Sequence, residues 1–173
     1  MRILIAAESQ YIAFHGQAIF TMNLAEGLAR RGHEVKVLAL SERGHTYQSE
    51  RRGVQIEGLR SLSMGLFHPD TYLSILPEKR VRQVFNLFRP EIVHVQDHYP
   101  LNRCVMRNAR RYGVKRVGTN HFMPENLAPY VPIVSKIKPL YNWVLWHWML
   151  DVFNRLDAVA APSRSEERRV GKA

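Results

Sequence analysis

The chain begins with MRILIAAESQYIAFHGQAIFTMNLAEGLARRGHEVKVLAL (residues 1–40). Ile3 to Ala7 form a continuous apolar run, which is typical of a strand buried on both faces. Residues 17–31 then repeat apolar side chains at helical spacing, and Gly32 follows as a helix stop. A second apolar run, residues 35–40, comes directly after. We therefore expect a strand, a crossover helix and a second, parallel strand in this part of the chain.

The same alternation continues along the rest of the chain. Short apolar runs predict four further strands, at residues 54–56, 92–95, 115–119 and 158–161. Helical periodicity predicts three further helices, which run from Pro77 to Pro90, from Pro100 to Gly113 and from Pro139 to Phe153. Strands that alternate with helices require right-handed parallel crossovers. The predicted fold class is α/β: a doubly wound, mostly parallel, Rossmann-like sheet with helices on both faces.

The composition fits one globular domain in a reducing compartment. A chain of 173 residues, 46% of them apolar, can close one hydrophobic core. Its single cysteine, Cys104, cannot form an internal disulfide, which favours the cytosol. No apolar run is long enough for a signal peptide or a membrane span. The net charge of +10 suits nucleic acid, an anionic lipid surface or a phosphorylated substrate. We do not expect nucleic acid as the partner, because no recognition motif accompanies the charge.

Polar residues that follow the predicted strands mark a candidate site, because ligands of such sheets bind beyond the carboxyl ends of the strands. These residues are Glu8, Ser9, Gln10, His15, Gly16, Gln17, Gln96, Asp97, His98, Asn120, His121 and Ser163. Gly16 precedes a helix and fits either a bound anion or a simple turn. His121 fits either a ligand contact or a structural hydrogen bond, and the residues alone favour neither. His94, Asp97, His98 and His121 could be drawn as a cluster, but we expect no metal, since no H-x-x-x-H or C-x-x-C pairing supports a closed site.

Four longer segments carry a family resemblance. They are NLAEGLARRGHEVKVLAL (23–40), PEIVHVQDHYPL (90–101), VGTNHFMPENLAPYVP (117–132) and LDAVAAPSRS (156–165). Together they resemble glycosyltransferase family 4, and the third is most similar to the branch that glycosylates diacylglycerol or related membrane lipids. The resemblance implies a GT-B fold, in which two doubly wound domains face each other across a cleft. It also implies a metal-independent, retaining hexosyltransferase with a nucleotide-sugar donor, which we expect to be UDP-linked.

The resemblance also assigns roles to individual residues. Gly16 and Gln17 would approach the donor diphosphate, and His121 would contact the transferred sugar beside the reacting centre. The acceptor side would be lined by Glu8, Asp97, His98, Asn120, Glu125 and Asn126. Residues 1–165 would form the amino-terminal, acceptor-side domain and residues 166–173 an atypical tail, with the carboxyl-terminal donor-binding domain absent. We therefore expect the 173-residue chain to be inactive alone.

A basic and aromatic region suggests membrane contact. Helical spacing places Arg103, Arg107 and Arg110 opposite the predicted buried face of their helix, with Arg111 beside them. Lysines and aromatic residues follow: Lys136, Lys138, Tyr141, Trp143, Trp146 and Trp148. This combination predicts peripheral docking on the anionic inner face of the cytoplasmic membrane. Packing of the aromatic helix into the core competes with this interpretation. The alternative function is a non-catalytic basic module that docks on membranes or polyanions.

Overall fold

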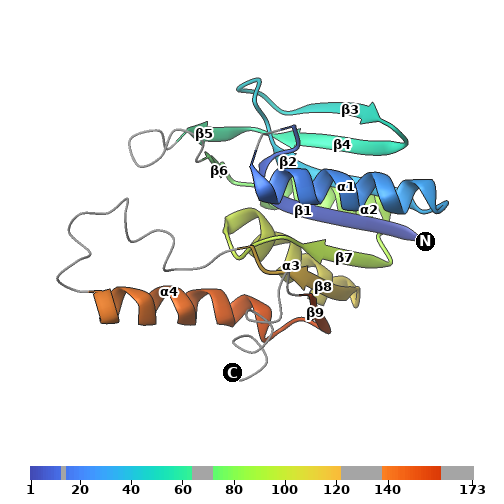
Figure 1. Ribbon diagram of the computed structural model, residues 1–173. Coiled ribbons are helices and arrows are strands. Elements are labelled where there is room, and N and C mark those ends of the chain that lie inside the picture. The colour runs from blue at the N-terminus through green and yellow to red at the C-terminus, as the bar shows by residue number, and fades with distance from the viewer. Residues whose placement is uncertain (13–14, 64–71, 122–137, 161–173) are drawn as a thin grey trace.

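The computed structural model contains a seven-stranded, mostly parallel sheet with helices on both faces (Figure 1). It describes residues 1–12, 15–63, 72–121 and 138–160. In order across the sheet, the strands are β3 (Tyr47–Arg51), β4 (Val54–Leu59), β2 (Glu34–Leu40), β1 (Arg2–Gln10), β7 (Ile92–Val95), β8 (Lys115–Thr119) and β9 (Ala158–Ala160). The predicted doubly wound α/β fold is confirmed.

Two hydrophobic cores hold the helices on the sheet. Helix α1 (Gly16–Arg30) covers one face, where Ala25 packs with Ile5 and Val37. The other face carries α2 (Glu78–Phe88), α3 (Pro100–Tyr112) and the carboxyl-terminal half of α4 (Lys138–Phe153). There Phe85 and Phe153 pack in the same buried cluster as the sheet residues. This division follows from the strand pattern, because alternate residues of a strand point to opposite faces.

The order of the strands reverses between β1 and β7. From β1 the chain proceeds outward through β2 and β4 on one side, and later through β7, β8 and β9 on the other. The pairing of β1 with β7 ends at Ala6 and Val95, but β1 continues to Gln10. Such a reversal opens a crevice at the carboxyl ends of the two central strands, where ligands of these folds bind.

The structure adds strands that the sequence pattern did not predict. Strand β3 pairs antiparallel with β4 through a turn at Arg52 and Gly53, which both have positive φ. Its sequence, YQSER, is largely exposed and lacks an apolar pattern. Strands β5 (Ser61–Ser63) and β6 (Tyr72–Ser74) form a separate two-stranded sheet and have three residues each. The remaining predicted strands and helices are present.

Helix α4 is apolar around most of its circumference. Its carboxyl-terminal residues Met149, Val152 and Phe153 are buried in the core, as the packing interpretation expected. Trp143 is 58% exposed and Val144 48% exposed. Within the described part of the chain, no helix combines the length and the apolar character that a membrane span needs.

Candidate functional site

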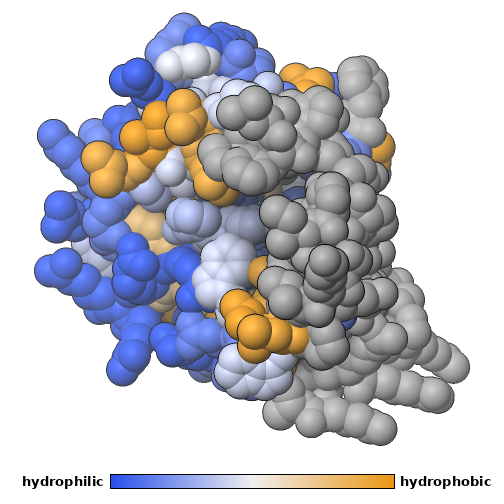
Figure 2. All heavy atoms as spheres, turned by 90° about the vertical axis from the view of Figure 1, so that its left-hand side faces the viewer, coloured by the Kyte–Doolittle hydropathy of each residue, from blue (hydrophilic) through white to orange (hydrophobic). Residues whose placement is uncertain are grey.

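The candidate site lies at the carboxyl ends of β1, β7 and β8, beside the start of α1. In Figure 1 these ends face left, since β1 begins at the N-terminus on the right. Figure 2 looks onto this edge, where hydrophobic residues are exposed among hydrophilic ones. The carboxyl ends of β1 and β7 therefore lie on the side that Figure 2 presents.

Glu8 and Asp97 form a buried carboxylate pair beneath this edge. Glu8 is 8% exposed and Asp97 is 1% exposed. The carboxylate of Glu8 accepts the backbone N–H groups of Ser74 and Leu101, both at 2.6 Å. Asp97 accepts the N–H of Glu8 at 2.8 Å. Burial raises the pKa of both carboxyl groups, and the charge of Asp97 raises that of Glu8 further. The pair ties β1, β6, β7 and the first turn of α3 together.

Asp97 also holds the start of α1 at the crevice. The side-chain Nε2 of Gln17 donates a hydrogen bond of 2.7 Å to Asp97 Oδ2. His15 caps the helix, since its Nδ1 accepts the N–H of Ala18 at 3.4 Å. Gly16 is exposed, and a Cβ added to it would meet no atom within 4 Å. The first-turn amides of a helix lack intrahelical acceptors, so the backbone at Gly16 is open to an anion.

His121 is held in place by a buried glutamine. Its Nε2 lies 2.7 Å from Oε1 of Gln96, and its ring meets Phe20 of α1 edge-on at 4.8 Å between centroids. Burial, with a smaller contribution from His15, lowers the pKa of His121 to about 4. The imidazole is therefore neutral at neutral pH. With the amide oxygen facing the ring, Nε2 carries the proton, which leaves Nδ1 to accept a hydrogen bond from a hydroxyl group.

A second histidine, His94, belongs to the same group of polar side chains on the sheet as Gln96 and His121. His94 Nε2 lies 2.9 Å from Thr119 Oγ1, and burial followed by the neighbouring His121 lowers the pKa of His94 to about 4. His94 and Gln96 alternate along the chain with Val93 and Val95, which pack against α2 and α3. The two polar side chains therefore belong to the opposite face, the one that α1 covers. His94 is therefore a half-buried, hydrogen-bonded residue of the sheet.

His98 and Asn120 are enclosed. His98 has no exposed surface, stacks on Tyr99 at 4.6 Å and meets Trp148 of α4 edge-on at 4.4 Å. Burial, with a smaller contribution from Arg103, lowers the pKa of His98 to about 3. Asn120 is 1% exposed, and its N–H donates to the carbonyl of Ala160.

The structure brings most of the predicted site residues to one edge but buries several of them. Gly16 and His121 remain accessible, whereas Glu8, Asp97 and His98 were expected on the open rim and instead lie beneath it. The reason is that their neighbours come from distant segments, which the local pattern does not reveal. Glu125, Asn126 and Ser163 lie outside the described residues. The binding roles assigned to the acceptor-side residues, to Gly16 and Gln17, and to His121 stay predictions.

The arginines of α3 also differ in their surroundings. Arg103 was expected on an exposed stripe, but its side chain is 23% exposed and contacts α4. Its Nη1 lies 2.7 Å from Asp151 Oδ2, and its Nε donates to the carbonyl oxygen of His98 at 2.9 Å. Arg107 is exposed and pairs with Glu78 at 2.9 Å. Arg110 and Arg111 are exposed as predicted.

Sequence reasoning named Gln96 at the end of its strand but gave it no role, and it missed Phe20. Gln96 directly precedes Asp97, and a glutamine at a strand end carries no acid-base signal. The alternation with Val93 and Val95 places it on the same face as His94 and could have identified it. Phe20 is 36% exposed on the first turns of α1. Its contact with His121 spans about a hundred residues of chain, and no local pattern predicts it.

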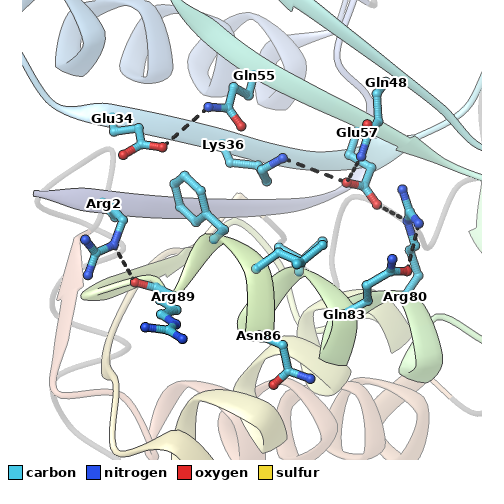
Figure 3. Close-up of a pocket in the computed structure, with 13 residues that line it drawn as sticks. Arg2, Glu34, Lys36, Gln48, Gln55, Glu57, Arg80, Gln83, Asn86 and Arg89 are labelled. Atoms are coloured by element: carbon cyan, nitrogen blue, oxygen red, sulfur yellow. Dashed lines mark hydrogen bonds and ion pairs between the residues drawn. The ribbon is translucent and has the colours of Figure 1, made fainter.

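A groove of about 770 Å³ lies at the other end of the sheet (Figure 3). Arg2 and Glu34 line it at the amino ends of β1 and β2. Figure 3 shows Lys36, Gln48 and Arg80 converging on the buried carboxylate of Glu57. This groove is separate from the candidate site, because it runs from the amino ends of β1 and β2 along α2 to Glu57 and shares no lining residue with that site. Among the described residues, no group of three or more His, Cys, Asp or Glu side chains could hold a metal ion.

The family model that describes glycosyltransferase family 4 matches residues 14–173. The chain belongs to glycosyltransferase family 4. A search of curated proteins found no match to this family 4 chain. Among solved structures, it is similar to sucrose-phosphate synthase from Thermosynechococcus elongatus, with a TM-score of 0.58 and 13% identity over 98% of this chain and 81% of that chain.

A second solved structure similar to this family 4 chain is the catalytic domain of starch synthase IV from Arabidopsis thaliana, bound to ADP and acarbose. Its TM-score is 0.44 and its identity is 16%, over 69% of this chain and 33% of that chain. The family match and the fold agree with the amino-terminal domain of a GT-B glycosyltransferase. The lipid-glycosylating branch stays a prediction.

Proposed function

We propose that this family 4 domain is the acceptor-side half of a retaining glycosyltransferase that moves a hexose from a nucleotide sugar, UDP-linked, to a lipid such as diacylglycerol. In this proposal a second domain holds the nucleotide. These 173 residues alone would then contact the donor diphosphate and the acceptor without turnover. No metal takes part, and the reaction takes place at the cytoplasmic face of the membrane.

The neutral, fixed imidazole of His121 carries the proposal. Its Nε2–H is engaged by Gln96, so its remaining ring nitrogen is an acceptor for a hydroxyl of the transferred sugar. An open helix start at Gly16, held by the contact of Gln17 with Asp97, adjoins the same crevice and suits a diphosphate. Preorganised groups of this kind stabilise developing charge without reorganising during the reaction.

Membrane docking is supported by two exposed surfaces. Arg107, Arg110 and Arg111 present positive charge on α3. Trp143 and Val144 expose apolar surface on α4. Each basic residue near an anionic leaflet adds roughly 1 kcal/mol, and tryptophan favours the bilayer interface. Together they would hold the domain reversibly at the membrane that contains its acceptor.

The site is tested by binding, because turnover is not expected of this chain. We would label the whole chain uniformly with ¹⁵N and titrate UDP-glucose and dihexanoylglycerol separately while recording the spectra of the backbone amides and the histidine rings. The expected result is a shift at His121 and at the backbone amides of Gly16 and Gln17. The amide shifts should weaken in His121→Ala, and all three should remain in the exposed-histidine control His45→Gln. Saturating shifts confined to other parts of the chain would contradict the proposed site.

The second candidate function is a non-catalytic module that docks on anionic membranes. The exposed apolar surface of α4 and the exposed arginines of α3 favour it. Sedimentation with vesicles separates the two candidates when combined with the titration. Binding to anionic rather than neutral vesicles, together with no response of His121 to either small ligand, would leave only the docking module. Equal pelleting with both vesicle types would remove the membrane from both proposals.

A further inference from the structure

A second concave surface, the arginine groove, runs between α3 and the end of α4. Its volume is about 450 Å³, and its charged lining residues are Arg103, Arg107, Arg110, Arg116, Arg155 and Asp151. Three separate segments contribute: α3, the start of β8, and the end of α4 with the residues that follow it. The groove extends toward the amino ends of the strands, because Arg116 is the second residue of β8 and Arg155 precedes β9. The candidate site lies at the carboxyl ends.

The carboxylates around the arginine groove do not balance its positive charge. Asp151 is shared, since both Arg103 and Arg155 donate to it. Arg116 pairs with Asp157 at 3.3 Å, and Arg107 pairs with Glu78 at 2.9 Å. Five arginines thus face three carboxylates. The surplus of positive charge is gathered in a concavity, where like charges repel one another more strongly than on an open surface.

Arg110 is the arginine of this groove that has its donors available. Over the described ranges its guanidinium makes no hydrogen bond or ion pair with another residue. It lies three residues after Arg107, so both side chains project from the same face of α3. A guanidinium offers five N–H donors in a planar fork that matches the oxygens of a phosphate group. The groove therefore contains one guanidinium with available N–H donors, that of Arg110, among arginines that are already oriented by their carboxylate partners.

We propose that the arginine groove binds a phosphate monoester or free phosphate as a dianion, at the end of the sheet opposite the proposed transfer site. The surplus charge matches the charge of a phosphate monoester above pH 7. The volume is within the range of small-molecule sites and accommodates the phosphate with part of its substituent. The source is either a soluble phosphate or a phosphorylated lipid headgroup. This site does not depend on the proposed transfer reaction.

The first experiment measures phosphate binding to the full chain at pH 7.5 by calorimetry, with ionic strength held constant by sodium chloride. Arg110→Gln removes the guanidinium whose donors are available. Arg111→Gln is the matched control, because Arg111 is an exposed neighbour on the same helix that does not line the groove. We expect Arg110→Gln to weaken phosphate binding about tenfold, the effect of one charge-assisted hydrogen bond. Arg111→Gln should change the affinity less than twofold.

A second arm identifies the source of the phosphate. Dihexanoyl phosphatidic acid is titrated below its micelle concentration, with dihexanoyl phosphatidylcholine as the zwitterionic comparison. Tighter binding of the phosphatidic acid than of inorganic phosphate, with the same dependence on Arg110, assigns a lipid headgroup. Equal affinities assign a soluble phosphate. The proposal is overturned if phosphate binds no better than chloride, or if Arg110→Gln and Arg111→Gln weaken binding equally.

Discussion

Replacing Gln96 by leucine tests whether Gln96 fixes the tautomer of His121, separately from its contribution to the stability of the fold. Gln96 has no exposed surface, and its Oε1 lies 2.7 Å from Nε2 of His121. Its own side-chain Nε2 is buried without a hydrogen-bond partner in the described chain. Leucine has a similar volume and no polar atoms, so Gln96→Leu removes the contact with His121 and the unsatisfied amide at once.

The two effects on the free energy of unfolding oppose each other. Losing one hydrogen bond costs about 0.5–1.5 kcal/mol net. Removing a buried, unsatisfied amide group gains about 1–3 kcal/mol, the desolvation cost of such a group. The expected net change therefore lies between a loss of about 0.5 and a gain of about 2.5 kcal/mol. The His121 ring, in contrast, loses the acceptor that holds its proton on Nε2.

Urea unfolding measures the stability, and ¹⁵N spectra of the imidazole nitrogens measure the tautomer. The wild-type ring should be neutral at pH 7 with its proton on Nε2, and Gln96→Leu should give a mixture of the two neutral tautomers. Gln83→Leu, an exposed glutamine on α2, is the control and should leave the His121 spectrum unchanged. An unchanged tautomer in Gln96→Leu, or a loss of more than about 3 kcal/mol, would show that Gln96 does not hold His121 in this way.

Three further predictions follow from contacts between distant segments. Arg103→Ala should lower the free energy of unfolding, measured by urea titration, by roughly 2–4 kcal/mol, because it removes the ion pair with Asp151 and hydrogen bonds to two backbone carbonyls. In the same titration, Arg111→Ala should be within about 0.5 kcal/mol of wild type. Gly118→Ala should cost about 1–3 kcal/mol, since its new Cβ would lie 2.5 Å from Leu156 Cδ1, and a thermal midpoint that does not fall would refute this packing. The third concerns pH: a histidine whose pKa in the folded state is lowered to about 4 favours the unfolded state as the pH falls below 6.5. The variant His121→Asn should therefore gain stability relative to wild type between pH 6.5 and 4. A stability difference that shrinks over this range would contradict the lowered pKa.

The sequence pattern predicted the strands and helices whose buried residues form a regular apolar pattern. The apolar run at the start of β1 and the αL glycine after α3, Gly113, both lie where the pattern placed them. Strand β3 escaped prediction because an edge strand with exposed polar residues has no apolar signature. For the site, the rule that ligands bind beyond the carboxyl ends correctly placed Gly16 and His121 at a common edge.

The direction of each polar side chain could not be predicted in the same way. Glu8 and Asp97 follow their strands as expected, yet each turns inward to satisfy buried N–H groups. Arg103 lies on the helix face opposite the strongest apolar positions, yet it reaches Asp151 on α4. In both cases the partner comes from a distant part of the chain.

By itself, the sequence determined the alternation of strands and helices, and with it the edge where the chemistry-bearing residues gather. This is so because hydrophobic periodicity and helix stops act within a few residues. Only the tertiary structure decided which of those residues stay accessible, as Gly16 does, and which become internal supports, as Asp97 does. Burial and hydrogen bonding depend on distant neighbours, such as Leu101 and Glu8, which lie 93 residues apart. A polar group that the fold buries must find its hydrogen-bond partner among such neighbours.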